Sequence, residues 1–183
     1  MPGLEDLYRE IILDHYRNPR NRGELPVPPA VRNEGFNPLC GDEIVVYLDV
    51  NNGTISDIRV AGQGCSISQS SASMMTSLVK GKSISEAREL ISKFKTMMSI
   101  HESALDTSGD SRSSANESGG LPAGDASNSS TSETERALNE DELASLGDLA
   151  ALQGVVKFPV RIKCATLSWN TLAQGLDEAS SSI

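Results

Sequence analysis

The sequence predicts a fold of mixed helices and strands, with its strands in one stretch of the chain and helices on either side of them. Alternating residues over 43–62, interrupted by Asn-Gly at 52–53, indicate a β-hairpin. Apolar residues spaced by three and four before and after this stretch indicate amphipathic helices.

Length and composition indicate one globular domain. The chain has 183 residues, of which 38% are apolar and 22% charged. Its N-terminus lacks the basic start and apolar run of a signal peptide, and no segment reaches the roughly 18 uninterrupted apolar residues of a membrane span. We therefore expect a single domain over residues 1–183, located in the cytoplasm, with no membrane partner. A net charge of −9 argues against nucleic acid as a partner.

The first elements follow from local patterns. A helix is expected over residues 4–17, where the apolar side chains form one stripe that Pro19 and Gly23 bring to an end. An extended segment is expected at about 31–36. The first hairpin strand is expected to begin at Glu43 and to be buried on one face, because apolar residues recur at every second position. These residues are Ile44, Val46, Leu48 and Val50.

The middle of the chain predicts two helices and then an insert. The helices are expected over 66–81, ending at Gly81, and over 83–98. The insert is acidic and serine-rich, and it interrupts the domain at about 103–142. It holds nine acidic residues and two arginines, so it carries −7 of the −9 net charge. We expect 103–136 to be disordered, because this part has too few large apolar side chains to offset its ordering entropy.

The C-terminal part predicts helices again. One or two short helices are expected over 138–155. A final helix is expected to start near Pro159 and to end near Gly175.

Three cysteines and one aspartate are the candidates for chemistry. Cys40 and Asp42 precede the first hairpin strand, and Cys65 follows the second. The start of one strand and the end of its antiparallel partner lie at the same end of a hairpin, so these three residues are expected to converge. Gly62 and Gly64 would permit a close approach of the backbone there. Cys164, near the start of the last helix, joins them if that turn faces the same end.

The residue types leave two interpretations open. Three thiolates and a carboxylate suit tetrahedral Zn²⁺, and thiolates also hold the iron of a cluster. Arg161 and Lys163, close to Cys164, are candidates to balance the negative charge of such a site. Alternatively, the cysteines form no CxxC pair and are buried core residues. His15 is expected to be packed or at an interface, and His101 to be solvated.

Four segments make the sequence resemble a known family. They are "LYREIILDHYRNPRN", "NPLCGDEI", "GQGCSISQSSASMM" and "LQGVVKFPVRIKCATLSWNTL". Together they are similar to the SufU branch of the IscU-like (NifU N-terminal-like) family of iron–sulfur cluster assembly proteins. The resemblance covers nearly all of the chain outside 103 to about 142. It implies an α+β fold, with a small three-stranded antiparallel sheet, helices packed on it and all metal ligands at one end.

The resemblance also implies a function. Zinc would be held by Cys40, Asp42, Cys65 and Cys164, and Cys40 would accept persulfide sulfur from a SufS-type, pyridoxal-phosphate-dependent cysteine desulfurase. A downstream sulfur acceptor or Suf scaffold protein would then receive the sulfur. We expect a docked desulfurase to free Cys40 by replacing it on the metal, because the glycine-containing loop of Cys40 can move. The expected activity is thus sulfurtransferase-like.

Two alternatives remain beside sulfur transfer. The first is an IscU-type scaffold that holds an iron–sulfur cluster on the same ligands. That branch has a histidine immediately before its last cysteine, where this chain has Lys163, and "GDLAALQGVVKFP" is a SufU-like insertion. Both features favour sulfur transfer. The second alternative is a structural zinc protein that acts as a binding module through its acidic insert.

Overall fold

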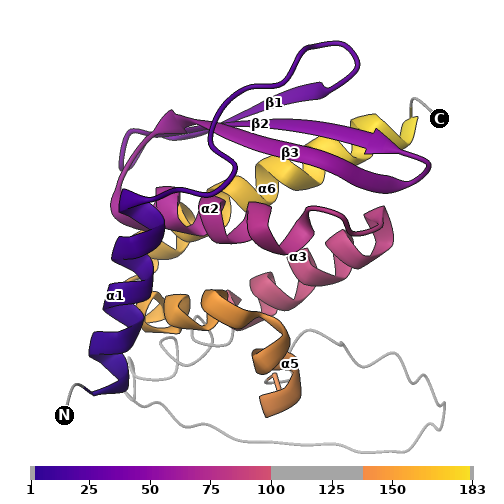
Figure 1. Ribbon diagram of the computed structural model, residues 1–183. Coiled ribbons are helices and arrows are strands. Elements are labelled where there is room, and N and C mark those ends of the chain that lie inside the picture. Colours follow the sequence, from indigo (N-terminus) through magenta and orange to yellow (C-terminus); the bar gives the residue numbers. More distant parts are fainter. Residues whose placement is uncertain (1–2, 100–137, 182–183) are drawn as a thin grey trace, which may run out of the picture.

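The computed structural model describes residues 3–99 and 138–181, and its elements confirm the α+β class. Figure 1 shows a small sheet with helices gathered on one side of it. Along the chain the elements are α1 (Leu4–Arg17), β1 (Val31–Asn37), β2 (Asp42–Asn51), β3 (Thr54–Gln63), α2 (Ser66–Val79), α3 (Ile84–Ser99), α5 (Glu140–Ser145), the 3₁₀ helix η2 (Gly147–Lys157) and α6 (Pro159–Ser181). No described helix is both long and apolar enough to cross a bilayer.

The sheet has the order β1-β2-β3, and both strand pairs are antiparallel. Asn52 and Gly53 both have positive φ, of 50° and 73°, which matches the right-handed twist of the hairpin between β2 and β3. A second tight connection joins β1 to β2, where Asn37 is paired with Asp42. The predicted hairpin is therefore confirmed, and the extended segment at 31–36 is the third strand.

The core lies between the sheet and the helices. Ile44, Val46 and Leu48 of β2 are at most 1% exposed. Helix α6 packs against β1 and β2 on one side and α2 on the other. The rings of Phe94 and Trp169 stack with centroids 4.6 Å apart, which joins α3 to α6.

The prediction that β2 is buried on one face only is wrong in the middle of the strand. Val45 and Tyr47, on the opposite face, are only 7% and 6% exposed. The segment between α1 and β1 crosses the sheet (Figure 1) and is tied to β3 by a hydrogen bond of 3.0 Å from the Gly23 N–H to the Val60 carbonyl. The alternation of residues within a strand cannot show that a segment from elsewhere in the chain covers its second face.

The predicted end of the last helix near Gly175 is also wrong, because α6 continues to Ser181. Gly175 is buried, and a Cβ there would lie 3.0 Å from Asn33 Oδ1 of β1. Its lack of a side chain thus brings the helix close to the sheet and does not end it.

The other predicted helices match α1, α2 and α3 within a residue or two, and the short helices over 138–155 are α5 and η2. Because α5 begins at Glu140, the last residues of the insert predicted at about 103–142 are helical. The remainder of the insert up to residue 137, with the predicted disorder over 103–136, lies outside the described residues. So does His101.

Candidate metal centre

Three element ends meet at one end of the sheet. The turn between β1 and β2 carries Cys40, and Asp42 is the first residue of β2. Gly41 has a φ of 67° and donates its N–H to the Asn37 carbonyl at 2.9 Å, which closes this turn. Cys65 is separated from the end of β3 by Gly64 and is the N-cap residue of α2. Cys164 lies in the second turn of α6.

Cys40, Asp42 and Cys164 form a tight cluster. One ligand atom from each lies within 4.8 Å of the others, and the Sγ atoms of Cys164 and Cys40 are 3.1 Å apart. Cys65 lies beside the cluster and not within it. Its N–H donates to Asp42 Oδ1 at 2.8 Å, and its Sγ is 4.0 Å from Asp42 Oδ2. The structure thus brings three of the four predicted ligands together and places the fourth against Asp42.

Burial and hydrogen bonds set the protonation of the two buried members. Asp42 and Cys164 are fully buried, whereas Cys40 is exposed. Burial, the hydrogen bond to Cys40 and the nearby Asp42 raise the pKa of Cys164 far above its ordinary value. Burial also opposes ionisation of Asp42, but the backbone N–H of Cys65 and hydrogen bonds from neighbouring side chains outweigh it and lower the pKa of Asp42. A cation at this point would favour ionisation of both groups.

Sequence reasoning missed Asn37. Its amide nitrogen lies 3.5 Å from both Asp42 Oδ2 and Cys164 Sγ, and the residue is 5% exposed. It therefore bridges two members of the cluster. The only sequence signal is its position before Pro38, which reads as an ordinary turn.

Two glycines permit a close approach at this end of the sheet, as predicted. A Cβ on Gly64 would lie 2.6 Å from Asp42 Oδ1 and 2.5 Å from Ser68 Oγ. Gly62 has a φ of 109°, and a Cβ there would overlap the Glu43 carbonyl. A side chain at either position would displace β2 or its first residue.

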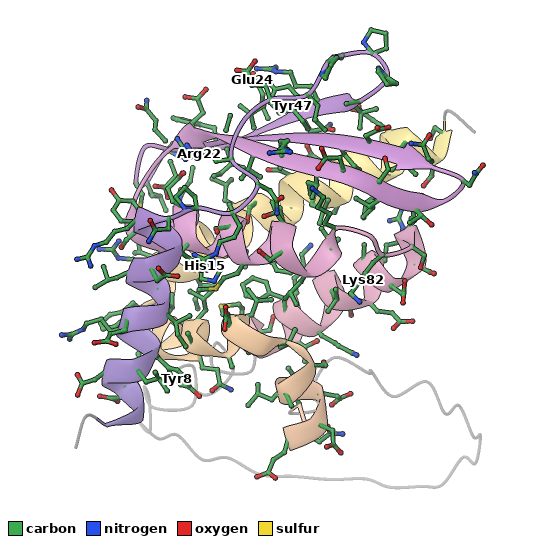
Figure 2. All side chains as sticks on the ribbon, viewed as in Figure 1. Tyr8, His15, Arg22, Glu24, Tyr47 and Lys82 are labelled. Atoms are coloured by element: carbon green, nitrogen blue, oxygen red, sulfur yellow. The ribbon has the colours of Figure 1, made fainter. Side chains whose placement is uncertain are left out.

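The other predicted residues are not members of the cluster. Arg161 and Lys163 are exposed on the first two turns of α6, and neither side chain makes a hydrogen bond or ion pair with the part of the chain that the structure describes. His15 is packed, as predicted, and 3% exposed. It points from α1 toward the helical layer (Figure 2), with Nδ1 2.8 Å from Ser73 Oγ and Nε2 3.0 Å from Asp148 Oδ2.

The cluster fits a zinc ion. Zn–S bonds are about 2.3 Å long, so two sulfurs on one zinc ion lie roughly 4 Å apart. The ligand atoms of the cluster all lie within 4.8 Å of one another, and the Cys40 and Cys164 Sγ atoms, 3.1 Å apart, would separate by about 1 Å around the ion. Thiolates and one carboxylate also have the chemistry that zinc prefers, and thiolates bind the iron of clusters as well.

Comparison with known sequences gives a consistent family. The chain matches the model of the NifU-like N-terminal domain over residues 7–118. It is 38% identical to the zinc-dependent sulfurtransferase SufU of Bacillus subtilis, over 94% of this chain and 91% of that protein. It is 34% identical to the iron–sulfur cluster assembly scaffold protein IscU of Streptococcus pyogenes, over 97% of this chain and 87% of that protein.

Solved structures that resemble this one come from the same family as the related sequences. The structure of a candidate iron–sulfur cluster assembly scaffold protein for the SUF system, from Fervidobacterium islandicum, superposes with a TM-score of 0.66 at 25% identity and covers 95% of this chain and 99% of that one. A NifU-like protein from Brucella abortus shares the fold, with a TM-score of 0.62 at 18% identity over 98% of this chain and 99% of that one. The chain therefore belongs to the IscU-like family of iron–sulfur cluster assembly proteins, the family of the NifU-like N-terminal domain, and within it is a SufU-type member.

Proposed function

We propose that this chain is a cytoplasmic, zinc-dependent sulfur-transfer protein that accepts persulfide sulfur from a SufS-type cysteine desulfurase and passes it on for iron–sulfur cluster assembly. The observation that carries the proposal is the pairing of one exposed thiol, Cys40, with two buried donors, Cys164 and Asp42. One member of the cluster is reachable by another protein, and the other two are fixed in the core.

Zinc, held by Cys40, Asp42, Cys65 and Cys164, would keep the cysteines as thiolates and shield them from oxidation. The chain's own residues prepare this site. The N–H of Cys65 keeps Asp42 ionised, and the amide of Asn37 bridges Asp42 and Cys164. The name of the Bacillus subtilis relative supports zinc as the metal.

Cys40 is the best placed sulfur acceptor. It lies next to Gly41 in a tight turn, whereas Cys65 and Cys164 are attached to helices. In the transfer, the Cys40 thiolate attacks the terminal sulfur of the desulfurase persulfide. A new S–S bond forms at Cys40, the S–S bond in the desulfurase breaks, and the electron pair leaves with the desulfurase thiolate.

Exposed apolar side chains beside the cluster support docking of a protein there. Phe36 and Leu39, on either side of the start of the β1–β2 turn, are 65% and 62% exposed. Phe158 and Val160, at the start of α6, are 60% and 53% exposed. Apolar groups grouped around a site are typical of surfaces that bind other proteins.

The test is desulfurase turnover with and without this protein. Wild-type protein should stimulate a SufS-type desulfurase, and Cys40→Ser should abolish the stimulation. A Ser77→Ala variant, which alters an exposed side chain of α2, serves as the matched control and should stimulate fully. Circular dichroism of each variant checks the fold. Full stimulation by Cys40→Ser would contradict the role of Cys40.

A cluster scaffold is the second candidate, because two relatives, at 34% and 30% identity, are named as scaffold proteins. Metal analysis and the visible spectrum of protein purified without oxygen separate the two functions. Sulfur transfer predicts stoichiometric, colourless zinc, and a scaffold predicts a coloured iron cluster.

Deletion of the acidic insert tests the alternative that the protein is a binding module. Deletion of residues 103–136 should leave desulfurase stimulation unchanged if the thiol cluster does the work. Loss of stimulation with zinc retained would favour a binding role for the insert.

A further inference from the structure

A cationic cavity lies beside the thiol cluster. Its volume is about 320 Å³, and its lining includes Tyr16 and Arg17 of α1, Arg22, Gly64 and Gln69. Gly64 immediately precedes Cys65, and Gln69 is one helical turn after Cys65. We propose that this cavity binds a small oxyanion, either a carboxylate or a phosphate. The proposal is independent of sulfur transfer.

Arg22 is held in place without an acidic partner. Its Nη1 donates to Gln69 Oε1 at 3.0 Å, and its Nη2 donates to the Gly62 carbonyl at 2.8 Å. Both acceptors are neutral. A guanidinium has five N–H donors, so three remain for a ligand. Figure 2 shows Arg22 between the end of the sheet and the top of α1.

Gln69 supplies a second, independent observation. The residue is only 8% exposed, and its Nε2 has no hydrogen-bond partner among the described residues. Because Oε1 accepts from Arg22, the orientation of the amide is fixed and Nε2 remains the donor. A buried donor without an acceptor costs about 1–3 kcal/mol. The Nε2 atom has less than 1 Å² of accessible surface, so an anion in the adjoining cavity would become its acceptor after a small displacement of the Gln69 side chain.

The charges that line the cavity have one sign. Arg17 and Arg22 contribute two guanidinium groups, and no carboxylate is among the lining residues. Neither arginine forms an ion pair with a described residue. By contrast, the neighbouring Arg20 is paired with Asp14 at 2.5 Å. The cavity therefore keeps its cationic groups available.

The ligand class follows from these donors. A guanidinium fork matches the spacing of two oxygens on a carboxylate or a phosphate, and such charge-assisted bonds are among the strongest in proteins. A cavity of about 320 Å³ accommodates a molecule of amino-acid size. The site thus suits a small anion next to Cys65.

The experiment is an NMR titration of the full-length, zinc-loaded chain with sodium acetate and with sodium phosphate, each replacing chloride at constant ionic strength. We expect saturable shifts of the Gln69 side-chain amide and the Arg22 Nε–H with at least one probe, and the stronger probe identifies the class. Gln69→Glu, which brings its own carboxylate, and Arg22→Gln should each weaken binding about tenfold or more.

The matched control is Arg9→Gln, which removes the same charge from an exposed position on α1 outside this cavity. It should bind like wild type, and backbone spectra of all variants check the fold. Shifts that rise linearly without saturation for both probes, or equal affinity in Gln69→Glu and wild type, would overturn the proposal.

Discussion

Replacement of Asp42 separates its two roles, as an acceptor for a backbone N–H and as a metal ligand. The carboxylate is fully buried and accepts the Cys65 N–H at 2.8 Å. Asp42→Asn keeps an oxygen near that N–H but removes the charge. Asp42→Ala removes both, and it leaves the N–H at the start of α2 without this acceptor.

The two variants should therefore differ in stability even without metal. A hydrogen bond to a charged group contributes about 1.5–3 kcal/mol, and a neutral one about 1 kcal/mol. We expect Asp42→Ala to lower the free energy of unfolding by about 3 kcal/mol and Asp42→Asn by about 1 kcal/mol. At roughly 2–4 °C per kcal/mol for a chain of this size, the melting temperature falls by about 6–12 °C and about 2–4 °C.

The assay is thermal unfolding by circular dichroism under reducing conditions, with chelator and then with a small excess of zinc. A ligand that binds only the folded state at 100 times its Kd adds about 2.7 kcal/mol, so zinc should raise the wild-type melting temperature clearly. It should raise that of both variants much less. Equal melting temperatures for the two metal-free variants would refute the N–H argument. An equal zinc response in Asp42→Asn and wild type would refute Asp42 as a ligand.

Three further predictions concern the rest of the fold. Gly35→Ala should cost about 1–3 kcal/mol in urea unfolding, because a Cβ there would overlap the Thr171 hydroxyl of α6; a neutral effect would show that α6 can shift. His15→Ala should cost about 2–3 kcal/mol, since it empties a buried position and removes two hydrogen bonds, and an unchanged urea midpoint would disprove this. Burial opposes ionisation of Asp57, but the hydrogen bond from Lys80 outweighs it and lowers the pKa of Asp57. The ionised Asp57 therefore stabilises the fold above the unfolded pKa of about 3.9, and this stabilisation is lost as the pH falls through the lower folded pKa. Asp57→Asn should cost up to about 1 kcal/mol at pH 7 and nothing at the acid end of a urea-unfolding pH series.

Local patterns were enough to locate most elements. The Asn-Gly turn and the alternation around it locate the β2–β3 hairpin, although a shift between Asp49 and Val50 changes the register by one residue beyond the turn. Antiparallel pairing alone brings Cys40, Asp42 and Cys65 to one end without knowledge of any other contact. Helices α1, α2 and α3 follow from apolar spacing in the same way.

Other features depended on partners distant in the sequence. Gly175 reads as a helix end, but its role is close packing of α6 on β1. Val45 and Tyr47 occupy positions that alternation assigns to the solvent face, yet both are buried. In each case the deciding neighbour lies far along the chain, so no local window contains the information.

The candidate site likewise has some features that follow from local sequence and others that follow from tertiary packing. The sequence by itself determined which side chains have metal chemistry and that three of them share one end of a hairpin, since residue type and the position of a hairpin turn are local properties. Only the tertiary structure decided that Cys164 arrives from α6 to lie 3.1 Å from Cys40, that Cys65 stays at the edge of the cluster, and that Asn37 bridges it. These positions are set by how α6 packs on the sheet, and packing of a helix on strands more than a hundred residues away is a property of the whole core.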